Sequence, residues 1–135
     1  DFRLMRKFMV PWNVNILAQD YLSVCIKSKE YLSETWESTK RLRAIQCAAI
    51  KRAFPTWEIL GREFLSWMWI DTKDEGVAER AVDVAKAWGC PIRWGKKGYD
   101  RPTFIRMAVR KNELFDVLFS ALKQEFGSAD AIGTQ

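Results

Sequence analysis

Two arginines, Arg93 and Arg106, lie on short β-like runs on either side of a turn rich in glycine and positive charge. The runs cover residues 92–94 and 104–109, and the turn between them reads Gly95-Lys-Lys-Gly-Tyr-Asp-Arg101. Side chains on a strand alternate between its two faces, so each strand fixes the direction of its arginine. A guanidinium group matches a carboxylate or a phosphate through two parallel hydrogen bonds. The segment is therefore predicted to recognise a small anionic ligand.

Each of these residues also has a purely structural interpretation. Arg106 either binds a ligand or forms a salt bridge within the sheet, and Arg93 either binds a ligand or faces solvent or a carboxylate. Tyr99 can hydrogen-bond a ligand or cofactor, although a packing role is the more common one for tyrosine. The remaining cations of the segment are interpreted as a solvated turn and as surface charges: Lys96, Lys97, Arg101 and Arg110.

The composition is typical of one globular domain with a real core. The chain has 135 residues, of which 48% are apolar, with seven Trp and eight Phe. Its formal charge of +5 is modest and spread along the chain, so it permits contact with nucleic acid or membrane without requiring it. No apolar run approaches the roughly 18–20 residues of a transmembrane helix, and no signal peptide is visible.

The sequence contains no histidine, the commonest general base and the commonest metal ligand. A Ser–His or Cys–His nucleophile is therefore excluded within this sequence. Cys25, Cys47 and Cys90 are odd in number and widely spaced, without a Cys-x-x-Cys pair. We expect them to be buried free thiols of a reducing compartment such as the cytoplasm. Neither a metal site nor a catalytic residue is predicted in this chain.

The first half of the sequence predicts long helical segments. Residues 1–12 are expected to be a connector from a missing large domain, and the start at Asp1 suggests a processed or fragmentary chain. Asn13 or Asn15 can cap a helix whose apolar residues run nearly all round from 16 to 26, which predicts burial on most sides. A narrower apolar stripe follows over 32–49. We expect one long helix, or two joined near 27–30, ending before Pro55.

The second half predicts strands and two amphipathic helices. Residues 57–70 favour a strand broken at Gly61-Arg62. Its second part should place Trp67, Trp69 and Leu65 on one side and Phe64, Met68 and Ile70 on the other. The pair Trp67/Trp69 is therefore expected in the core or at a domain interface rather than as a platform for stacking bases.

Helix boundaries in this half are predicted from capping residues. Thr72-Lys-Asp-Glu75 fits a capping box, and the helix that follows should close at Gly89. Asn112 is expected to cap a last helix that closes at Gly127. Residues 128–135 are small and polar and are expected to be a flexible tail.

The order of elements predicts an α/β (α+β) fold. We expect residues 13–127 to form a two-layer small domain, with a long N-terminal helix followed by a small, mostly antiparallel sheet covered by helices on one face. The second aromatic face of the Phe64–Ile70 strand would remain uncovered. Because large exposed apolar patches mark interfaces, this face predicts a partner layer outside the sequence.

An ordered series of segments resembles the small domain of class I/II aminotransferases, in the branch of histidinol-phosphate aminotransferase and threonine-phosphate decarboxylase. Pro11-Trp-Asn-Val-Asn-Ile-Leu-Ala-Gln19 is similar to the segment that enters that domain. Phe64-Leu-Ser-Trp-Met-Trp-Ile-Asp71, Gly89-Cys-Pro-Ile-Arg93, Gly98-Tyr99 and Phe104-Ile-Arg-Met-Ala-Val-Arg110 look like its remainder. The resemblance covers roughly residues 9–126 and rests on the series rather than on one motif. Alliinase-like tryptophan aminotransferases have a related layout.

This resemblance implies fold-type I pyridoxal 5'-phosphate chemistry and a homodimeric full-length transferase of amino-acid metabolism. It implies that Arg106 binds the α-carboxylate of an amino-acid or keto-acid substrate, and that Arg93 helps to hold a distal phosphate. Asn13, Asn15 and Tyr99 would line the active site without an assigned role. The family's Schiff-base lysine, its aspartate and its phosphate-binding loop lie upstream of the matching segment, and none is present. Serine and lysine in Ser23…Lys27 and Ser38-Thr-Lys40 lack the family context, so this chain alone is expected to be inactive.

Two alternative functions remain open at this point. A catalytically inactive aminotransferase-like subunit or scaffold in a larger assembly would also lack the cofactor residues and carry an uncovered aromatic face. An RNA-binding α/β module would explain the mixture of cations and aromatics in Arg93-Trp-Gly-Lys-Lys-Gly-Tyr99. The low net charge and the continuous apolar runs that contain most aromatics argue against nucleic acid.

Overall fold

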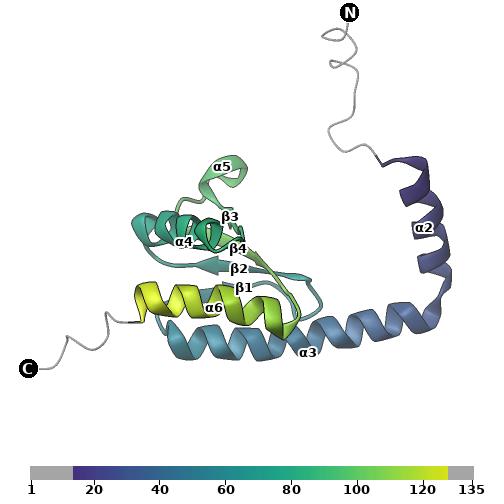
Figure 1. Ribbon diagram of the computed structural model, residues 1–135, viewed down its shortest axis with the longest axis horizontal. Helices are drawn as coiled ribbons and strands as arrows, with labels where there is room; N and C mark the ends of the chain where they lie inside the picture. Colours follow the sequence, from purple (N-terminus) through teal and green to yellow (C-terminus); the bar gives the residue numbers. More distant parts are fainter. Residues whose placement is uncertain (1–13, 128–135) are drawn as a thin grey trace, which may run out of the picture. The chain divides into compact units, whose positions relative to one another are not determined.

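The computed structural model describes residues 14–127, and these residues fall into two compact units that divide between Thr35 and Trp36 (Figure 1). The expected connector 1–12, Asn13 and the tail 128–135 lie outside the described residues. The first unit holds helix α2 (Ile16–Lys27) and the beginning of α3 (Lys29–Ala53). The prediction of two helices joined near 27–30 is confirmed, because Ser28 has an extended backbone between them.

Helix α2 begins as predicted but is not buried. Asn15 is its N-cap, and the side-chain Oδ1 accepts a hydrogen bond from the backbone N–H of Ala18 at 2.8 Å. Within α2, which the structure describes completely, Leu17 is 75% exposed and no residue is buried. The expectation of burial on most sides is therefore wrong for this chain. An all-round apolar pattern requires neighbours on several sides, and the described part of this unit supplies no second layer around α2.

The second unit contains a four-stranded antiparallel sheet in the order β1-β2-β4-β3. Its strands are β1 (Glu58–Leu60), β2 (Trp67–Asp71), β3 (Arg93–Trp94) and β4 (Phe104–Ala108). The predicted break near Gly61-Arg62 is confirmed as the loop between β1 and β2. Strand β2 begins only at Trp67, because Leu65 closes a turn by donating its backbone N–H to Arg62 O at 3.1 Å. The prediction that Phe64 and Leu65 alternate within the strand is wrong.

Helices α4 (Glu75–Ala87) and α6 (Asn112–Phe126) complete the unit and lie alongside the sheet in Figure 1. Gly89 follows α4 with a φ of 71°, as the predicted glycine stop requires. The capping residues differ from those predicted. Asp74, not Thr72, caps α4 by accepting from Val77 N at 2.9 Å, and Lys111 rather than Asn112 is the N-cap of α6, without a side-chain bond.

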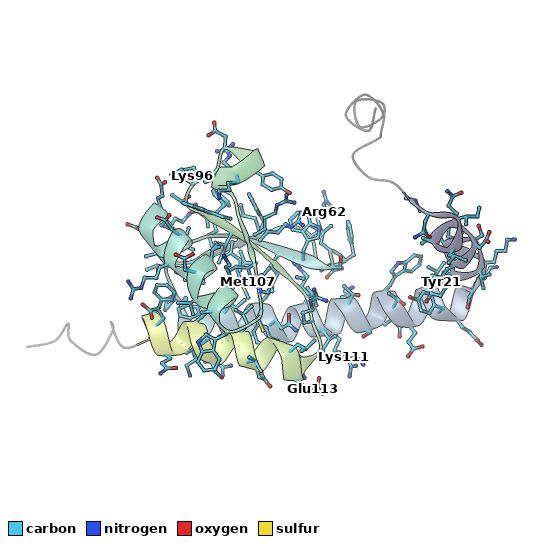
Figure 2. All side chains as sticks on the ribbon, turned by 45° about the horizontal axis from the view of Figure 1, so that its top comes forward. Tyr21, Arg62, Lys96, Met107, Lys111 and Glu113 are labelled. Atoms are coloured by element: carbon cyan, nitrogen blue, oxygen red, sulfur yellow. The ribbon has the colours of Figure 1, made fainter. Side chains whose placement is uncertain are left out.

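One face of the sheet is covered by helices. Met68 and Ile70 of β2 point to this face together with Ile105 and Met107 of β4, and all four are essentially inaccessible to solvent. Figure 2 shows Met107 inside the unit, whereas the charged side chains of Lys96, Lys111 and Glu113 extend outward. Three helices contribute apolar residues to the same core: Ile50 from α3, Ala78, Ala81 and Ala85 from α4, and Phe115, Leu118 and Leu122 from α6, together with Phe54 directly after α3. The predicted mixed fold with helices on one face is confirmed.

Candidate anion-binding site

The second face of the sheet carries the two arginines that the sequence singles out. Arg106 on β4 lies between Trp69 on β2 and Arg93 on β3, because the register pairs it with both residues. Trp67, Trp69 and Phe104 belong to the same face and are half-buried, in contrast to their fully buried neighbours along the strands. We call this surface the open face. Because Arg93 and Arg106 are cross-strand partners, their side chains start from the same face of the sheet.

The guanidinium of Arg106 is held by aromatic groups rather than by a carboxylate. Its Nη1 donates a hydrogen bond to the hydroxyl oxygen of Tyr99 at 3.0 Å, and its Cζ lies 5.7 Å from the centre of the Trp67 ring. Among residues 14–127 no carboxylate forms an ion pair with Arg106. A guanidinium has five N–H donors, so several remain able to bind an anion.

A pocket of about 350 Å³ opens beside this guanidinium on the open face. Aromatic rings and cations form its wall: Trp67, Trp69, Tyr99, Arg101 and Arg106. Its size is at the lower end of the range for small-molecule sites. The Trp69 ring is stacked on Phe104 at 5.2 Å and meets the Tyr99 ring edge-on at 5.1 Å, so the wall consists of mutually packed rings. The arrangement suits a small acid with an apolar body.

Arg93 is adjacent to this pocket but does not line it. Its Cζ lies 5.7 Å from the centre of the Tyr99 ring, a cation–π contact on the residue that receives the hydrogen bond from Arg106. Tyr99 therefore links the two arginines. The geometry gives Arg93 a role in holding Tyr99, and it places Arg101 rather than Arg93 at the pocket wall.

Backbone hydrogen bonds fix the turn that carries Tyr99 and Arg101 to its flanking residues. Gly95 N donates to Phe104 O at 2.7 Å, and Arg101 N donates to Gly95 O at 3.1 Å. A Cβ at Gly95 would lie only 2.5 Å from Arg101 O, so this close approach requires glycine. The short helix α5 (Lys96–Tyr99) occupies the turn, with a left-handed residue, Asp100, at its end.

Two side-chain hydrogen bonds also stabilise this turn. The indole Nε1 of Trp94 donates to Pro102 O at 2.8 Å. Lys96 Nζ donates to Glu75 Oε1 at 2.6 Å, and this hydrogen bond raises the pKa of Lys96. The interpretation of Lys96 as a purely solvated residue is therefore incomplete. It joins the turn to the first residue of α4.

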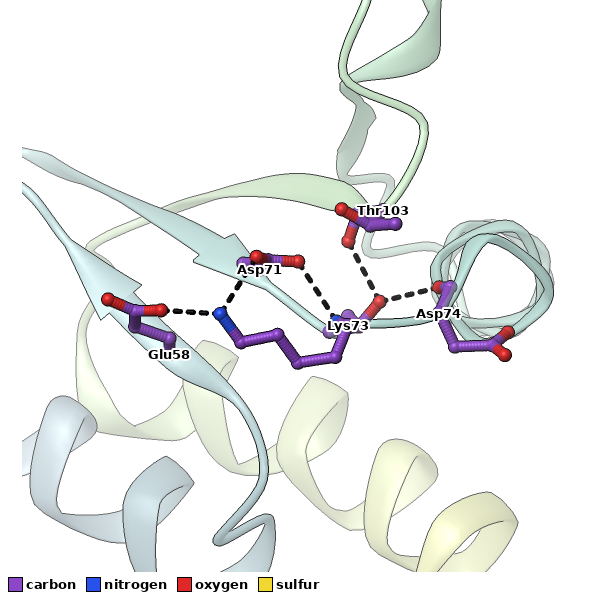
Figure 3. A network of polar contacts seen from close by, with 6 residues as sticks. Glu58, Asp71, Lys73, Asp74 and Thr103 are labelled. Carbon is purple, nitrogen blue, oxygen red and sulfur yellow. Dashed lines mark hydrogen bonds and ion pairs between the residues drawn. The ribbon is translucent and has the colours of Figure 1, made fainter.

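A second polar network closes the end of the sheet next to β1, as Figure 3 shows. Lys73 Nζ bridges Glu58 and Asp71 at 2.5 and 3.0 Å, and its backbone N–H donates to Asp71 Oδ1 at 2.9 Å. Burial raises the pKa of Asp71, but the hydrogen bonds from Lys73 outweigh it and leave this pKa below its ordinary value. Thr72 is buried and its Oγ1 lies 2.8 Å from both Asp74 O and Thr103 O, which explains why it does not cap α4.

Sequence reasoning missed two arginines. Arg101 was interpreted as a surface charge, yet it lines the pocket as well as being exposed. Arg43 of α3 is only 4% exposed and donates to the carbonyl oxygens of Trp67, Leu60 and Gly61 at 2.5, 3.2 and 3.2 Å. The available signal for Arg43 was a cation within an apolar helical stripe. It is a structural residue that fixes the loop between β1 and β2.

Asn15 acts as the cap of α2, and Asn13 lies outside the described residues. Cys25, Cys47 and Cys90 are free and half-buried rather than fully buried, and burial raises the pKa of the Cys47 thiol. Between residues 14 and 127 no cluster of three or more His, Cys, Asp or Glu side chains could hold a metal ion. No helix in this part of the chain is long and apolar enough to cross a membrane.

The pocket does not fit pyridoxal 5'-phosphate as a sole binding site. No lysine and no carboxylate lines it, so it offers neither an amine for a covalent bond nor a partner for a protonated pyridine nitrogen. Lys73 and Lys96 form ion pairs with other residues. What the pocket does offer is guanidinium groups for an acid.

No family model matches the sequence, and no curated protein matches it significantly.

Proposed function

We propose that this chain is the small domain of a fold-type I pyridoxal-phosphate-dependent aminotransferase or decarboxylase, in which Arg106 binds the carboxylate of an amino-acid or keto-acid substrate. The observation that carries the proposal is the Arg106 guanidinium on a central strand, beside a pocket and without a carboxylate partner among the described residues. The family assignment in this proposal comes from the resemblance of the sequence.

An arginine that orients a substrate carboxylate must itself be held in a fixed position. Strand β4 is hydrogen-bonded on both sides, by β2 and β3, so the Cα of Arg106 is fixed in the middle of the sheet. Tyr99 and Trp67 then restrict the guanidinium, which lowers the entropy lost when a carboxylate binds. Aromatic neighbours also exclude water from one side of the ion pair, which strengthens it.

The cofactor would come from a different part of the protein. In this proposal a partner layer covers the open face and brings the cofactor with it, while this chain contributes the carboxylate contact. Pyridoxal phosphate added to the chain alone is therefore not expected to form a covalent adduct with a specific lysine. The measurement is the absorbance of such an adduct. A band that is lost when one lysine of the chain is replaced would contradict this expectation. The coding sequence upstream of Asp1 tests the family assignment directly, since a Ser-x-x-Lys region is expected there. An encoded product that begins near Asp1 would favour the scaffold interpretation.

Binding of 3-phenylpropionate to the 135-residue chain tests the role of Arg106. The indole N–H signals of Trp67 and Trp69 report on the pocket in a two-dimensional NMR titration. Hydrogen bonds to charged groups contribute about 1.5–3 kcal/mol, and the open pocket favours the lower end. We expect Arg106→Gln to weaken binding by about 10- to 100-fold at constant ionic strength.

Two controls separate carboxylate recognition from general attraction. The neutral 3-phenylpropanamide should bind the wild-type chain as weakly as the acid binds Arg106→Gln. Lys97→Gln removes one positive charge from the same turn and should leave the affinity of the acid nearly unchanged. Equal affinities of acid and amide, or of the wild type and Arg106→Gln, would refute the assignment of Arg106.

Single-stranded RNA binding is the second candidate function, and the open face favours it more than the sequence did. Trp67, Trp69 and Phe104 lie on the uncovered face of an antiparallel sheet beside two arginines, an arrangement on which bases can stack. A short single-stranded RNA that binds with a steep salt dependence and loses affinity in Trp69→Ala would support this alternative. Binding of the small acid without RNA binding would support the first proposal.

A further inference from the structure

A second cation lines the pocket on the open face. Arg101 lines the pocket together with Arg106, and no carboxylate lines it. Among the described residues Arg101 forms no ion pair. Two guanidinium groups on one wall of a small cavity repel each other, and a ligand with two negative groups would relieve that repulsion.

Arg101 reaches the pocket because its backbone is fixed. Its N–H donates to Gly95 O, and its carbonyl oxygen accepts from Phe104 N at 3.1 Å. The left-handed backbone of Asp100, with a φ of 53°, turns the chain just before it. The contacts of Trp94 with Pro102 and of Lys96 with Glu75 hold the two flanks of the turn. Arg101 is therefore anchored at its main chain, while its exposed side chain is free to meet a ligand.

Arg93 is less suited to this role, although it also lies on the open face. Its guanidinium stacks over the Tyr99 ring and is absent from the pocket wall. Movement into the pocket would give up that contact. Arg93 is thus a positioning residue that acts on Arg106 through Tyr99.

We infer that Arg101 is a specificity residue that binds a second anionic group of the ligand, so that the pocket prefers an acid with an aromatic or apolar body and two negative groups. This inference rests on the proposed role of Arg106 as the first carboxylate contact. The rings of Trp67, Trp69 and Tyr99 supply the apolar surface of the same cavity. The ligand class follows from this combination of two cations and three aromatic rings.

Two acids that differ by one carboxylate test the inference on the 135-residue chain. The probes are 3-phenylpropionate and 3-(4-carboxyphenyl)propionate, titrated at equal ionic strength with the indole N–H signals of Trp67 and Trp69 as the readout. We expect the diacid to bind about two- to fivefold more tightly, corresponding to about 0.4–1 kcal/mol for one additional exposed ion pair. Arg101→Gln should remove this advantage and leave the affinity of the monoacid unchanged.

The variants distinguish failure of the inference from failure of the proposed function. Lys97→Gln removes one charge from the same turn and should preserve the advantage of the diacid. If the advantage is absent in the wild type, survives in Arg101→Gln or disappears in Lys97→Gln, the assignment of Arg101 is wrong while Arg106 stands. If Arg106→Gln binds the monoacid like the wild type, or neither acid binds, both proposals are overturned.

Discussion

The two faces of the small sheet are built from the same strands and have opposite characters. On the covered face, Met68, Ile70, Ile105 and Met107 are aliphatic and fully buried. On the open face, the alternate residues of those strands include Trp69, Phe104 and Arg106, which are half-buried and leave a pocket. The residues of the covered face form the core of this unit. The residues of the open face stay partly accessible to solvent and can contact a ligand or a partner.

Two arginines, Arg43 and Arg106, differ in burial and in their hydrogen-bond partners. Arg43 approaches the sheet from α3, is almost completely buried and donates all its known hydrogen bonds to backbone carbonyl groups. Arg106 on the open face donates to one tyrosine hydroxyl and retains free donors beside a pocket. The same side chain therefore stabilises a loop in one place and is available to a ligand in the other.

The largest expected effect is on the covered face. Ile70→Ala removes a fully buried side chain and should lower the free energy of unfolding by about 2–5 kcal/mol. Urea denaturation followed by circular dichroism measures this change. Ala108→Gly, on the exposed end of β4, is a control that should cost only about 0.5–1 kcal/mol. Equal costs at the two positions would contradict the contrast between the faces.

Arg43→Lys should have the next largest effect, about 1–3 kcal/mol of unfolding free energy. An ammonium group cannot reproduce the fork that contacts Trp67 O and the two carbonyls of Leu60 and Gly61, so buried acceptors are left without donors. Arg106→Lys is the matched variant and should change stability by less than about 0.5 kcal/mol. If Arg106→Lys destabilises as much as Arg43→Lys, Arg106 is a structural residue and the proposed site is wrong.

A smaller effect is expected for self-association through the open face. Leu60 lies on this face beside Trp69 and is 38% exposed. The chain is expected to self-associate and to bind a hydrophobic dye, and Leu60→Ser should weaken self-association a few-fold in analytical ultracentrifugation. Val117 on α6 is similarly exposed, at 42%, but lies away from the sheet, so Val117→Ser is the control. A chain that stays monomeric at high concentration and binds no dye would argue against an uncovered interface.

The smallest expected effect concerns the Lys73 bridge at the sheet edge. Asp71→Asn should lower stability by at most about 1 kcal/mol, because the partner Lys73 is half-exposed and water screens the ion pair. Since the folded state lowers the pKa of Asp71, its contribution is present above the ordinary value of 3.8 and is lost as the pH falls further. Thermal melts should therefore separate wild type and variant at neutral pH and converge below pH 3.8. Asp83→Asn, on an exposed helix position, should show no comparable separation.

The apolar stripe expected over 32–49 is not the buried face of α3, because Ile45 is exposed and the buried residues are Arg43, Gln46 and Ile50. Other periodic patterns were read correctly from the sequence. The helical stripes of α4 and α6, the glycine stop after α4 and the alternation of Trp67 to Ile70 all follow from local periodicity. Boundaries were less predictable. Thr72 and Asp74 are both good caps by residue type, and the choice between them depends on Thr103, which is distant in the sequence.

The sequence by itself determined that Arg93 and Arg106 lie on strands and that aliphatic and aromatic residues alternate along β2, because these properties depend on local backbone geometry. Only the tertiary structure decided which arginine reaches the pocket. The register places Arg93 opposite Arg106, the Tyr99 ring engages Arg93, and the folded turn brings Arg101 to the pocket wall. Such contacts join residues through a turn and a sheet, and no local pattern encodes them.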